Sequence, residues 1–577
     1  MIRNFLLGLI AAASAAPGLG AASQAQPQLL LTHGHIRTPA GWVEALAANE
    51  RGVIVALGSS AGLERTAGRT TRRIDLKGAT VLPGFHDLHV HPIFAGLQAQ
   101  RCVIPQGSDL KSLQQRVRQC ALKARPGAWI TGGQWDAPAL GTTPDRTQLD
   151  AVSLGHPVLL GDTSEHSAWA NTAALEIAGV TRATPAPRGG IIERDSAGNP
   201  TGVLREDAGV LLVRSHVPPP TDQEVRSALT SSAKEMLTYG ITSFTEAAAG
   251  YSSGLDKEVG AYTSLAESGV LKQRIHVCLS WAPGDATAER YIATANLYSR
   301  ARLAVDCVKI FLDGVPTDSH TAAMLEPYQG KVAGRADAAS LKGLLLVPQP
   351  TLNAAVSRFD ALGLTVKFHA AGDAAVRAGL DAIEAARHAN GFSGILHEVG
   401  HCTFVAKQDI PRGRAIGATF EVSPYLWGPS PINDSITEAV GPMLIKRVWP
   451  IREMLQARAL VVAGSDWSVV PSVNPWIAVE SLVTRERAGG SEDSFGKAEA
   501  ITLEQAVQLF TVNAARQRHA ENRLGDITVG KLADLVVLDR DPFAIPVREL
   551  HSVRVMQTFI GGELVYRRSE QIERGRQ

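Results

Sequence analysis

The sequence predicts an α/β protein built on a (β/α)8 TIM barrel, and three observations support this fold class. Short apolar strands alternate with helical stretches between about residues 209 and 513, which is the pattern of a parallel barrel. Histidine, lysine and aspartate residues stand within or at the ends of several of these strands. Strand-like segments at both chain ends enclose the region. An open doubly wound sheet is the competing arrangement, but the chain has no GxGxxG or Walker loop.

The terminal segments, residues 26–82 and 520–570, contain strands divided by Gly-Gly and Asp-Pro turns. They predict one small β-sandwich domain assembled from both ends of the chain. Residues 83–519 then form the barrel domain. Within it, a stretch from about 98 to 208 is too long for a single loop of a barrel, so we expect an inserted subdomain there.

Residues 1–25 have the composition of a signal peptide. Arg3 supplies a positive start, residues 5–16 form an apolar run, and small residues lead to candidate cleavage sites at 19–21 or 23–25. The run is short for a transmembrane helix, and an uncleaved anchor or a terminal tail is the alternative interpretation. We expect an exported protein, periplasmic or extracellular, with no stable membrane span.

Charge and composition narrow the class of partner. The 577 residues include 57 Lys+Arg against 56 Asp+Glu, and 45% of them are hydrophobic. A large core is therefore expected, whereas a nucleic-acid partner is not, because no basic stripe is present. A small-molecule substrate is the expected partner, and a homo-oligomer is compatible with the sequence.

The five cysteines contain no zinc-finger spacing. Cys102 and Cys120 flank one amphipathic stretch, and export would permit a disulfide between them. Five buried thiols without a disulfide are the alternative.

The most informative motif is His89-Val90-His91, which follows the strand-like residues 81–85. Residues two apart in a strand point to the same face. Both imidazoles would therefore reach one cation, and imidazole suits zinc and similar metals. Two nearby histidines are by themselves more often ordinary polar residues.

Four later residues strengthen the metal hypothesis. Lys309 lies inside a strand-like apolar run, where a lysine is costly unless paired or modified. His369, His401 and Asp466 each stand at a predicted strand end, and the active residues of a TIM barrel gather at the carboxyl ends of its strands. The alternatives are a buried ion pair for Lys309, core histidines for His369 and His401, and a helix N-cap for Asp466.

Together these motifs resemble the amidohydrolase superfamily, and most closely amidohydrolase family 3, the YtcJ-like metal-dependent hydrolases. The resemblance covers nearly the whole chain after the signal peptide. It rests on residues 81–91, 166–171, 308–314, 369–373, 464–467 and 524–536. It implies a divalent metal, with zinc as the expected ion and one or two ions bound.

The resemblance also implies roles for individual residues. His89 and His91 would bind the more buried metal, Lys309 would be carboxylated and bridge two metals, and Asp466 would touch a metal and act as the acid–base group. His369 and His401 would bind the second metal. His401 departs from the family pattern because Gly400 and Cys402 flank it, and His397 is the rival ligand. His86 replaces an apolar residue of the family and is expected near the barrel floor.

Three further residues are candidates for the substrate site. Trp135 and His166 lie in segments that approach the active site in the family, and we expect His166 to contact the substrate or transition state. Trp135 as a core aromatic and His166 as a loop residue are the alternatives. Asp313, four residues after Lys309, would orient a ligand or cap a turn with Gly314.

The function that follows is hydrolysis of an amide-type, non-peptide C–N bond, such as that of an N-acyl or N-formyl amine, by metal-activated water. A deaminase or a lactonase/esterase on the same scaffold is the second hypothesis. A catalytically silent binding protein is the third. That third hypothesis predicts a lost ligand or a lost Asp466, and all six predicted metal-site residues are present.

Overall fold

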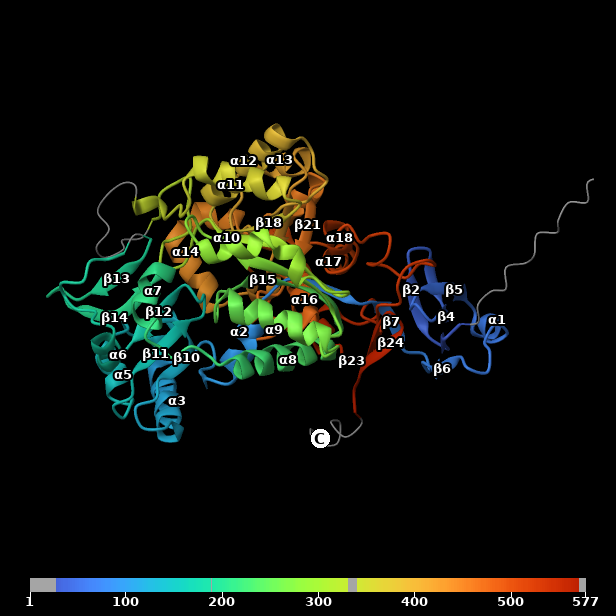
Figure 1. Ribbon diagram of the computed structural model, residues 1–577, viewed down its shortest axis with the longest axis horizontal. Coiled ribbons are helices and arrows are strands. Elements are labelled where there is room, and N and C mark those ends of the chain that lie inside the picture. Colours follow the sequence, from blue (N-terminus) through green and yellow to red (C-terminus); the bar gives the residue numbers. More distant parts are fainter. Residues whose placement is uncertain (1–26, 188, 330–339, 570–577) are drawn as a thin grey trace, which may run out of the picture.

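The computed structural model of the chain describes residues 27–187, 189–329 and 340–569. The predicted signal peptide, residues 1–25, lies outside the described residues. Three parts follow one another across Figure 1: an inserted subdomain, a central barrel, and a β domain that contains strands from both chain ends.

The predicted TIM barrel is confirmed. Eight parallel strands lie side by side in the order of the sequence. A bridge between Val90 and Trp467 joins the first strand region to the last. The barrel strands are β8 (Phe85–Val90), β15 (Ile241–Ala249), β16 (Arg274–Ser280), β17 (Leu303–Phe311), β18 (Thr365–Ala370), β19 (Glu398–His401), β20 (Thr419–Val422) and β21 (Leu460–Ala463).

Closure of the barrel requires a glycine after β21. A Cβ atom placed on Gly464 would lie 2.3 Å from the backbone nitrogen of His89 and 2.4 Å from its Cβ. Since real carbon atoms do not approach this closely, any larger residue would push β21 away from β8. Gly464 therefore allows the strand that leads to Asp466 to approach the strand that carries His89.

Helices cover the outside of the barrel, and their apolar faces form the main core with the strands. In α8, the buried Val225, Leu229 and Met236 recur at helical spacing, and Thr221 with Glu224 forms a capping box at its start. The barrel helices are α2 (Pro92–Ala99), α8 (Asp222–Thr238), α9 (Leu255–Glu267), α10 (Ala286–Ala293), α11 (Gln349–Ala361), α12 (Asp373–Asn390), α13 (Ile410–Ala415), α14 (Pro431–Leu444), α15 (Ile451–Gln456), α16 (Pro475–Thr484), α17 (Leu503–Leu509) and α18 (Val512–Gln517).

The inserted subdomain, called the insert below, contains a six-stranded sheet of order β13-β14-β12-β11-β10-β9 with its own hydrophobic cores. Its strands are β9 (Cys102–Val103), β10 (Ile130–Trp135), β11 (Val158–Asp162), β12 (Ser167–Ala170), β13 (Ile191–Arg194) and β14 (Pro200–Arg205). Its helices are α3 (Leu110–Lys123), α4 (Ala137–Leu140), α5 (Arg146–Asp150), α6 (Thr172–Ile177) and α7 (Glu206–Arg214).

Two disulfides are present. Cys102 of β9 pairs with Cys120 of α3, the pair for which the sequence left both a disulfide and free thiols open. A second disulfide, which the sequence did not predict, joins Cys278 and Cys307 on the neighbouring strands β16 and β17. Cys402 is a buried free thiol.

The β domain consists of two sheets. One has the order β5-β4-β1-β6; the other has the order β24-β23-β22-β7-β2-β3 and combines strands from both chain ends. Strand β22 pairs antiparallel with β7, so the C-terminal strands add directly to the N-terminal ones. The elements are β1 (Leu29–Thr32), β2 (His35–Thr38), β3 (Gly41–Val43), β4 (Ala45–Ala48), β5 (Ile54–Gly58), α1 (Ser60–Glu64), β6 (Arg72–Asp75), β7 (Thr80–Pro83), β22 (Leu535–Leu538), β23 (Val555–Ile560) and β24 (Glu563–Arg567).

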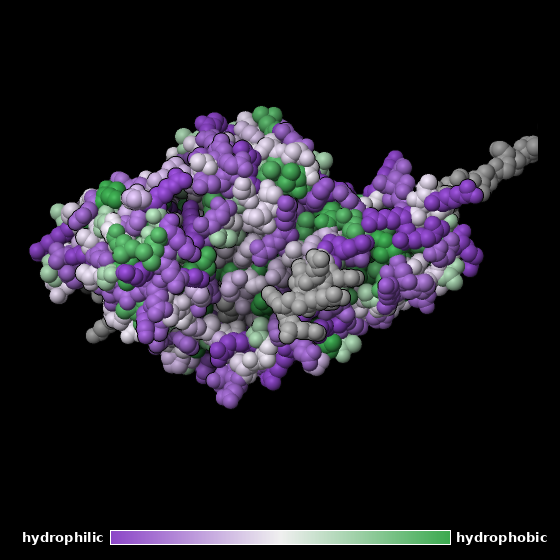
Figure 2. Space-filling view, turned by 90° about the horizontal axis from the view of Figure 1, so that it is seen from below, coloured by the Kyte–Doolittle hydropathy of each residue, from purple (hydrophilic) through white to green (hydrophobic). Residues whose placement is uncertain are grey.

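The described surface is largely polar on the face seen in Figure 2, where hydrophobic residues occur in small separate groups. Among the described residues, no helix combines the length and apolarity needed to cross a bilayer.

Candidate metal centre

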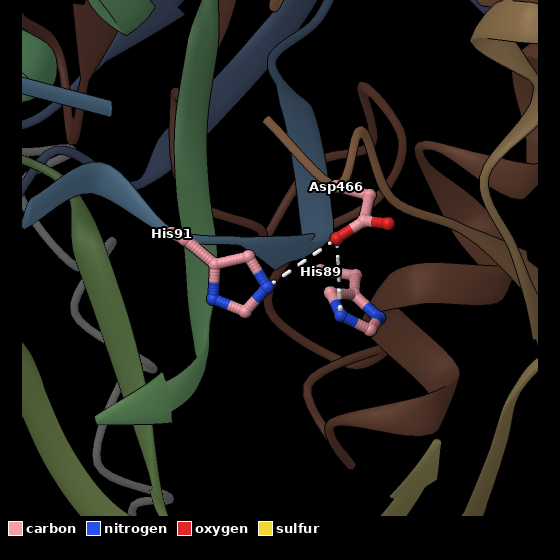
Figure 3. Close-up of side chains that lie close together, drawn as sticks. All are labelled: His89, His91 and Asp466. Atoms are coloured by element: carbon pink, nitrogen blue, oxygen red, sulfur yellow. Dashed lines mark ion pairs between the residues drawn. The ribbon is translucent and has the colours of Figure 1, made fainter. Parts of the chain in front are cut away.

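The His-Val-His motif lies where β8 ends. The Nε2 atoms of His89 and His91 lie 3.6 Å and 3.3 Å from the same carboxylate oxygen, Oδ1 of Asp466. Figure 3 shows that oxygen directed at both rings. One ligand atom from each of these residues falls within 4.8 Å of the other two, which is the spacing of groups that share a cation.

Carboxylates fix the orientation of the imidazole rings from behind. Nδ1 of His89 lies 2.6 Å from Glu421, and Nδ1 of His91 lies 3.3 Å from Glu246. A neutral histidine that donates from Nδ1 has a lone pair on Nε2, which is the atom a metal binds. The carboxylates therefore direct both Nε2 atoms toward the site. Although burial opposes it, hydrogen bonds to Asp466 and Glu246 raise the pKa of His91 to about 9, so a cation at its Nε2 would take the place of a proton.

The other predicted ligands lie in the same place. The ring centroid of His401 is 4.8 Å from that of His89 and 4.4 Å from that of His369. Nζ of Lys309 is 3.5 Å from Nε2 of His89, and Nδ1 of His401 is 3.8 Å from Oδ2 of Asp466. The structure thus brings all six predicted metal-site residues together at the carboxyl ends of the barrel strands.

Burial sets the charge of these groups. It lowers the pKa of His89, His369 and His401 well below the usual range, so these rings are neutral. Burial, followed by the charge of Lys367, lowers the pKa of Lys309 to about 7.

The donor set fits a divalent cation. Nε2 of His401 is buried and has no hydrogen-bond partner among the described residues, which is unfavourable for a nitrogen with no further role. The neutral imidazoles and one carboxylate supply the nitrogen and oxygen ligands that zinc and similar metals take.

The geometry separates His401 from its rival. Nδ1 of His397 accepts a hydrogen bond from the backbone of Val366 at 3.0 Å, and its Nε2 lies 3.0 Å from Asp360. His397 is fully buried away from the metal-site residues, whereas His401 lines the cavity. His86 stands at the start of β8, the opposite end of the barrel, where burial lowers its pKa to about 4.

Two predicted substrate contacts lie outside the cavity wall. Trp135 is 2% exposed, packs against Trp169, and donates its indole N–H to a backbone oxygen. Asp313 is fully buried and accepts hydrogen bonds from three backbone N–H groups, while its Oδ1 lies 3.1 Å from Nδ1 of His369. Neither side chain faces the cavity. Trp135 is therefore a core residue of the insert, the alternative given for it above, and not a substrate contact. Asp313 does not reach the substrate space either, and its contact with His369 is that of a carboxylate that orients a ligand, as expected from its position after Lys309.

His166 does line the cavity. Its Nδ1 lies 2.9 Å from Glu206, and its ring centroid is 5.0 Å from that of His369. The insert therefore contributes an oriented imidazole beside the metal-site residues.

A buried charge network lies behind the site. Nζ of Lys367 is 2.7 Å from Glu398 and 3.7 Å from Glu421, and all three side chains are 0% exposed. Sequence reasoning missed these residues and Glu246. The signal that drew attention to Lys309, a charged residue inside an apolar strand, was present at each of them.

The cavity in front of the predicted metal-site residues is mostly apolar. Among the described residues that line it there is no arginine, and Glu165 is the acidic residue besides Asp466. Its apolar walls are formed by Phe94, Tyr251, Phe311, Val315, Pro316, Trp427, Ile432, Ile436, Trp449, Val469 and Val470.

Comparison with known proteins gives a consistent result. A protein-family model described as "Amidohydrolase family" matches residues 72–566. The chain is 29% identical over 525 residues to the putative amidohydrolase YtcJ of Bacillus subtilis, covering 90% of this chain and 95% of that protein. It is 26% identical over 539 residues to the N-substituted formamide deformylase of Arthrobacter pascens, covering 90% and 94%.

Among solved structures, an uncharacterized metal-dependent hydrolase from Pyrococcus horikoshii OT3 superposes with a TM-score of 0.69 at 23% identity. The match covers 90% of this chain and 99% of that one. At this identity the likeness shows the shared fold.

Proposed function

We propose that this chain, which belongs to the amidohydrolase family, is a metal-dependent hydrolase that cleaves a non-peptide amide C–N bond, such as that of an N-acyl or N-formyl amine. The membership confirms the resemblance predicted from the motifs. The relative from Arthrobacter pascens, which is named as a deformylase of N-substituted formamides, supports this choice of bond.

The observation that carries the proposal is the position of Asp466. Its carboxylate lies between His89 and His91, and its backbone N–H donates to the carbonyl oxygen of His89 at 2.6 Å. The base is therefore fixed to the same strand end as the ligands. A carboxylate held beside the site of water activation is what amide hydrolysis requires.

We assign the cation to His89, His91, His369, His401 and Asp466, with zinc as the ion. When bound, a divalent cation supplies Lewis acidity that activates water and polarises a carbonyl. Asp466 accepts the proton of the attacking water and delivers it to the leaving nitrogen, first as general base and then as general acid. His166, oriented by Glu206, contacts the substrate from the side of the insert.

Lys309 is the proposed site of carboxylation. Its amine lies 3.5 Å from His89, and the lowered pKa favours the neutral form that reacts with carbon dioxide. Native mass spectrometry of the metal-loaded protein should show an added mass of about 44 Da that is absent from a Lys309→Met variant. A protein with full metal and an unmodified Lys309 would contradict this assignment.

We further propose that residues 1–25 direct export to the periplasm or the extracellular space. Amino-terminal sequencing of the secreted or periplasmic protein should begin after residue 21 or residue 25. A full-length protein confined to the cytoplasm would contradict the proposal.

The central test combines metal analysis with turnover. The purified protein should bind about one or two equivalents of zinc and release amine from members of a panel of N-acyl and N-formyl amines. An Asp466→Asn variant should lose this activity, while Asp526→Asn, which removes a carboxylate paired with Lys531, should keep it. Turnover of lactones, esters or aminopurines in place of amides would favour the lactonase/esterase or deaminase hypothesis.

A further inference from the structure

Two stacked tryptophans form one wall of the active-site cavity. Trp427 follows β20, and Trp449 precedes α15. Their ring centroids are 4.8 Å apart with an angle of 13° between the planes. Both rings line the cavity that contains the metal-site residues. We call this pair the tryptophan wall.

A fully buried arginine lies against the wall. The guanidinium carbon of Arg485 is 4.7 Å from the ring centroid of Trp427 and 5.6 Å from that of Trp449. Arg485 follows α16, and its side chain does not line the cavity. The arginine therefore contacts the tryptophans, which separate it from the substrate space.

Arg485 has no acidic partner among the described residues. Its Nε donates to the carbonyl oxygen of Phe495 at 2.9 Å, and neither Nη atom has a hydrogen-bond partner in the described part of the chain. Glu499, the acidic group whose charge acts on it, instead accepts the backbone N–H groups of Arg452 and Glu453.

A buried, unpaired cation is costly. The two π faces are the main compensation that the structure offers, since a guanidinium over an indole ring is attractive. Two consequences follow for the wall. The arginine fixes the orientation of both rings, and its positive charge acts through them on any group that contacts the rings from the cavity.

We infer that the tryptophan wall is the subsite for a planar, uncharged ring on the substrate, and that Arg485 is a positioning residue that holds the wall and disfavours a cationic ring. The two rings stack on each other, and only 1% of Trp427 and 7% of Trp449 are exposed. An aromatic group would therefore contact the small parts of the rings that reach the cavity, in edge-to-face geometry, whereas a cation would meet the charge of Arg485 behind them. The ring would be a substituent of the amide that is hydrolysed, and this part of the inference rests on the proposed function. The binding of a ring at the tryptophan wall does not depend on it.

The first measurement is binding, which needs no turnover. Saturation-transfer NMR on the zinc-loaded protein would compare benzyl alcohol with N-methylpyridinium, a planar cation of similar size. Benzyl alcohol should bind the wild type more tightly than N-methylpyridinium does. A Trp427→Leu variant should bind benzyl alcohol about three- to tenfold more weakly. Trp281→Leu is the matched control, because Trp281 is also buried but lies outside the cavity.

The role of Arg485 is tested by an Arg485→Met variant, which retains the length of the side chain and removes the charge. The preference for benzyl alcohol over N-methylpyridinium should shrink in this variant and persist in Arg485→Lys. If Arg485→Met does not fold, the comparison of wild type with Trp427→Leu still decides the subsite. Equal binding of both probes to the wild type, or unchanged benzyl alcohol binding by Trp427→Leu, would overturn the inference.

Kinetics separate this inference from the proposed function. If amides are hydrolysed, Trp427→Leu should raise KM for N-benzylacetamide and leave that for N-methylacetamide nearly unchanged, with kcat similar for both. If no amide is hydrolysed but the ring probes bind as expected, the proposed reaction fails and the ring subsite stands. If amides are hydrolysed without any preference for a ring, the proposed reaction stands and the ring subsite fails.

Discussion

Replacement of Glu421 by glutamine tests how the carboxylate behind His89 affects metal binding. The two side chains are buried, and the carboxylate oxygen lies 2.6 Å from Nδ1 of the imidazole. The charge makes this hydrogen bond strong and raises the basicity of Nε2, the atom that would bind the cation. Glutamine retains the shape and an acceptor oxygen but loses the charge.

The expected magnitude follows from the contacts. Loss of a group that supports a metal ligand costs about 10- to 100-fold in affinity, or about 1.4–2.7 kcal/mol. Because glutamine still accepts a hydrogen bond, we expect the lower end, about tenfold. Lys367 keeps its 2.7 Å partner Glu398, so no cation is left unpaired and the free energy of unfolding should change little.

The assay is competition for zinc between the apoprotein and a fluorescent chelator at pH 7. The control is Glu480→Gln, because Glu480 is a fully buried carboxylate 2.8 Å from Nδ1 of His551 and does not line the cavity. The control should bind zinc like the wild type. A Glu421→Gln variant with wild-type affinity and an intact fold would refute the reasoning that this carboxylate tunes its histidine.

Three further substitutions probe stability away from the reacting atoms. Lys367→Met leaves Glu398 and Glu421 as buried carboxylates without their shared cation, so the urea midpoint should fall by an amount equivalent to about 3–5 kcal/mol; an unchanged midpoint would contradict the buried network. Although burial opposes it, hydrogen bonds from His397 and its neighbours hold the pKa of Asp360 below the usual range. The stability gained from this group is present above the unfolded pKa of about 3.9 and is lost as the pH falls towards the lower folded value. Asp360→Asn should therefore be less stable than the wild type at pH 6, with a difference that narrows below about pH 4; a constant difference in urea titrations would exclude this linkage. Replacing Cys102 and Cys120 together by serine removes a crosslink between residues 18 apart and should cost about 3 kcal/mol. Reductant should then lower the stability of the wild type more than that of this double variant. An equal loss of stability in both would mean that the Cys102–Cys120 disulfide is not the one whose reduction destabilises the protein.

The barrel could be predicted because its signal is local. Strand-like runs around Phe244, Ile310, Phe368 and Val462 have the length and apolarity of buried parallel strands, and each lies in a barrel strand. The strand β20 was not identified from the sequence. It has four residues, and its run of apolar residues is interrupted by Glu421, so its apolar pattern is too short to distinguish a strand from a loop.

The proposed metal ligands could be predicted more readily than the groups that support them. His89 and His91 have the alternation of a strand, which places both rings on one face. Together with Lys309, His369, His401 and Asp466 in or at the ends of other strands, this spacing suggests a shared cation. Glu246 contacts His91 although the two are 155 positions apart in the sequence, and Glu421 contacts His89 across 332 positions. No pattern within one segment contains that pairing, and it becomes visible only when the barrel closes.

His401 shows why strand alternation could not choose every ligand. In a regular strand, Glu398 and Gly400 would share a face and His401 would point to the other one. The structure instead gives His401 a left-handed backbone with φ of 68°, which departs from the extended geometry that the alternation assumes. A side chain at Gly400 would come within 2.8 Å of the Glu421 carboxylate that holds His89. Gly400, which departs from the family pattern, therefore leaves room for the Glu421 carboxylate beside His89. The next residue, His401, has the left-handed backbone and lines the cavity. A Gly400→Ala variant should consequently weaken zinc binding as Glu421→Gln does, and normal zinc affinity in that variant would show that this contact can relax without disturbing His89.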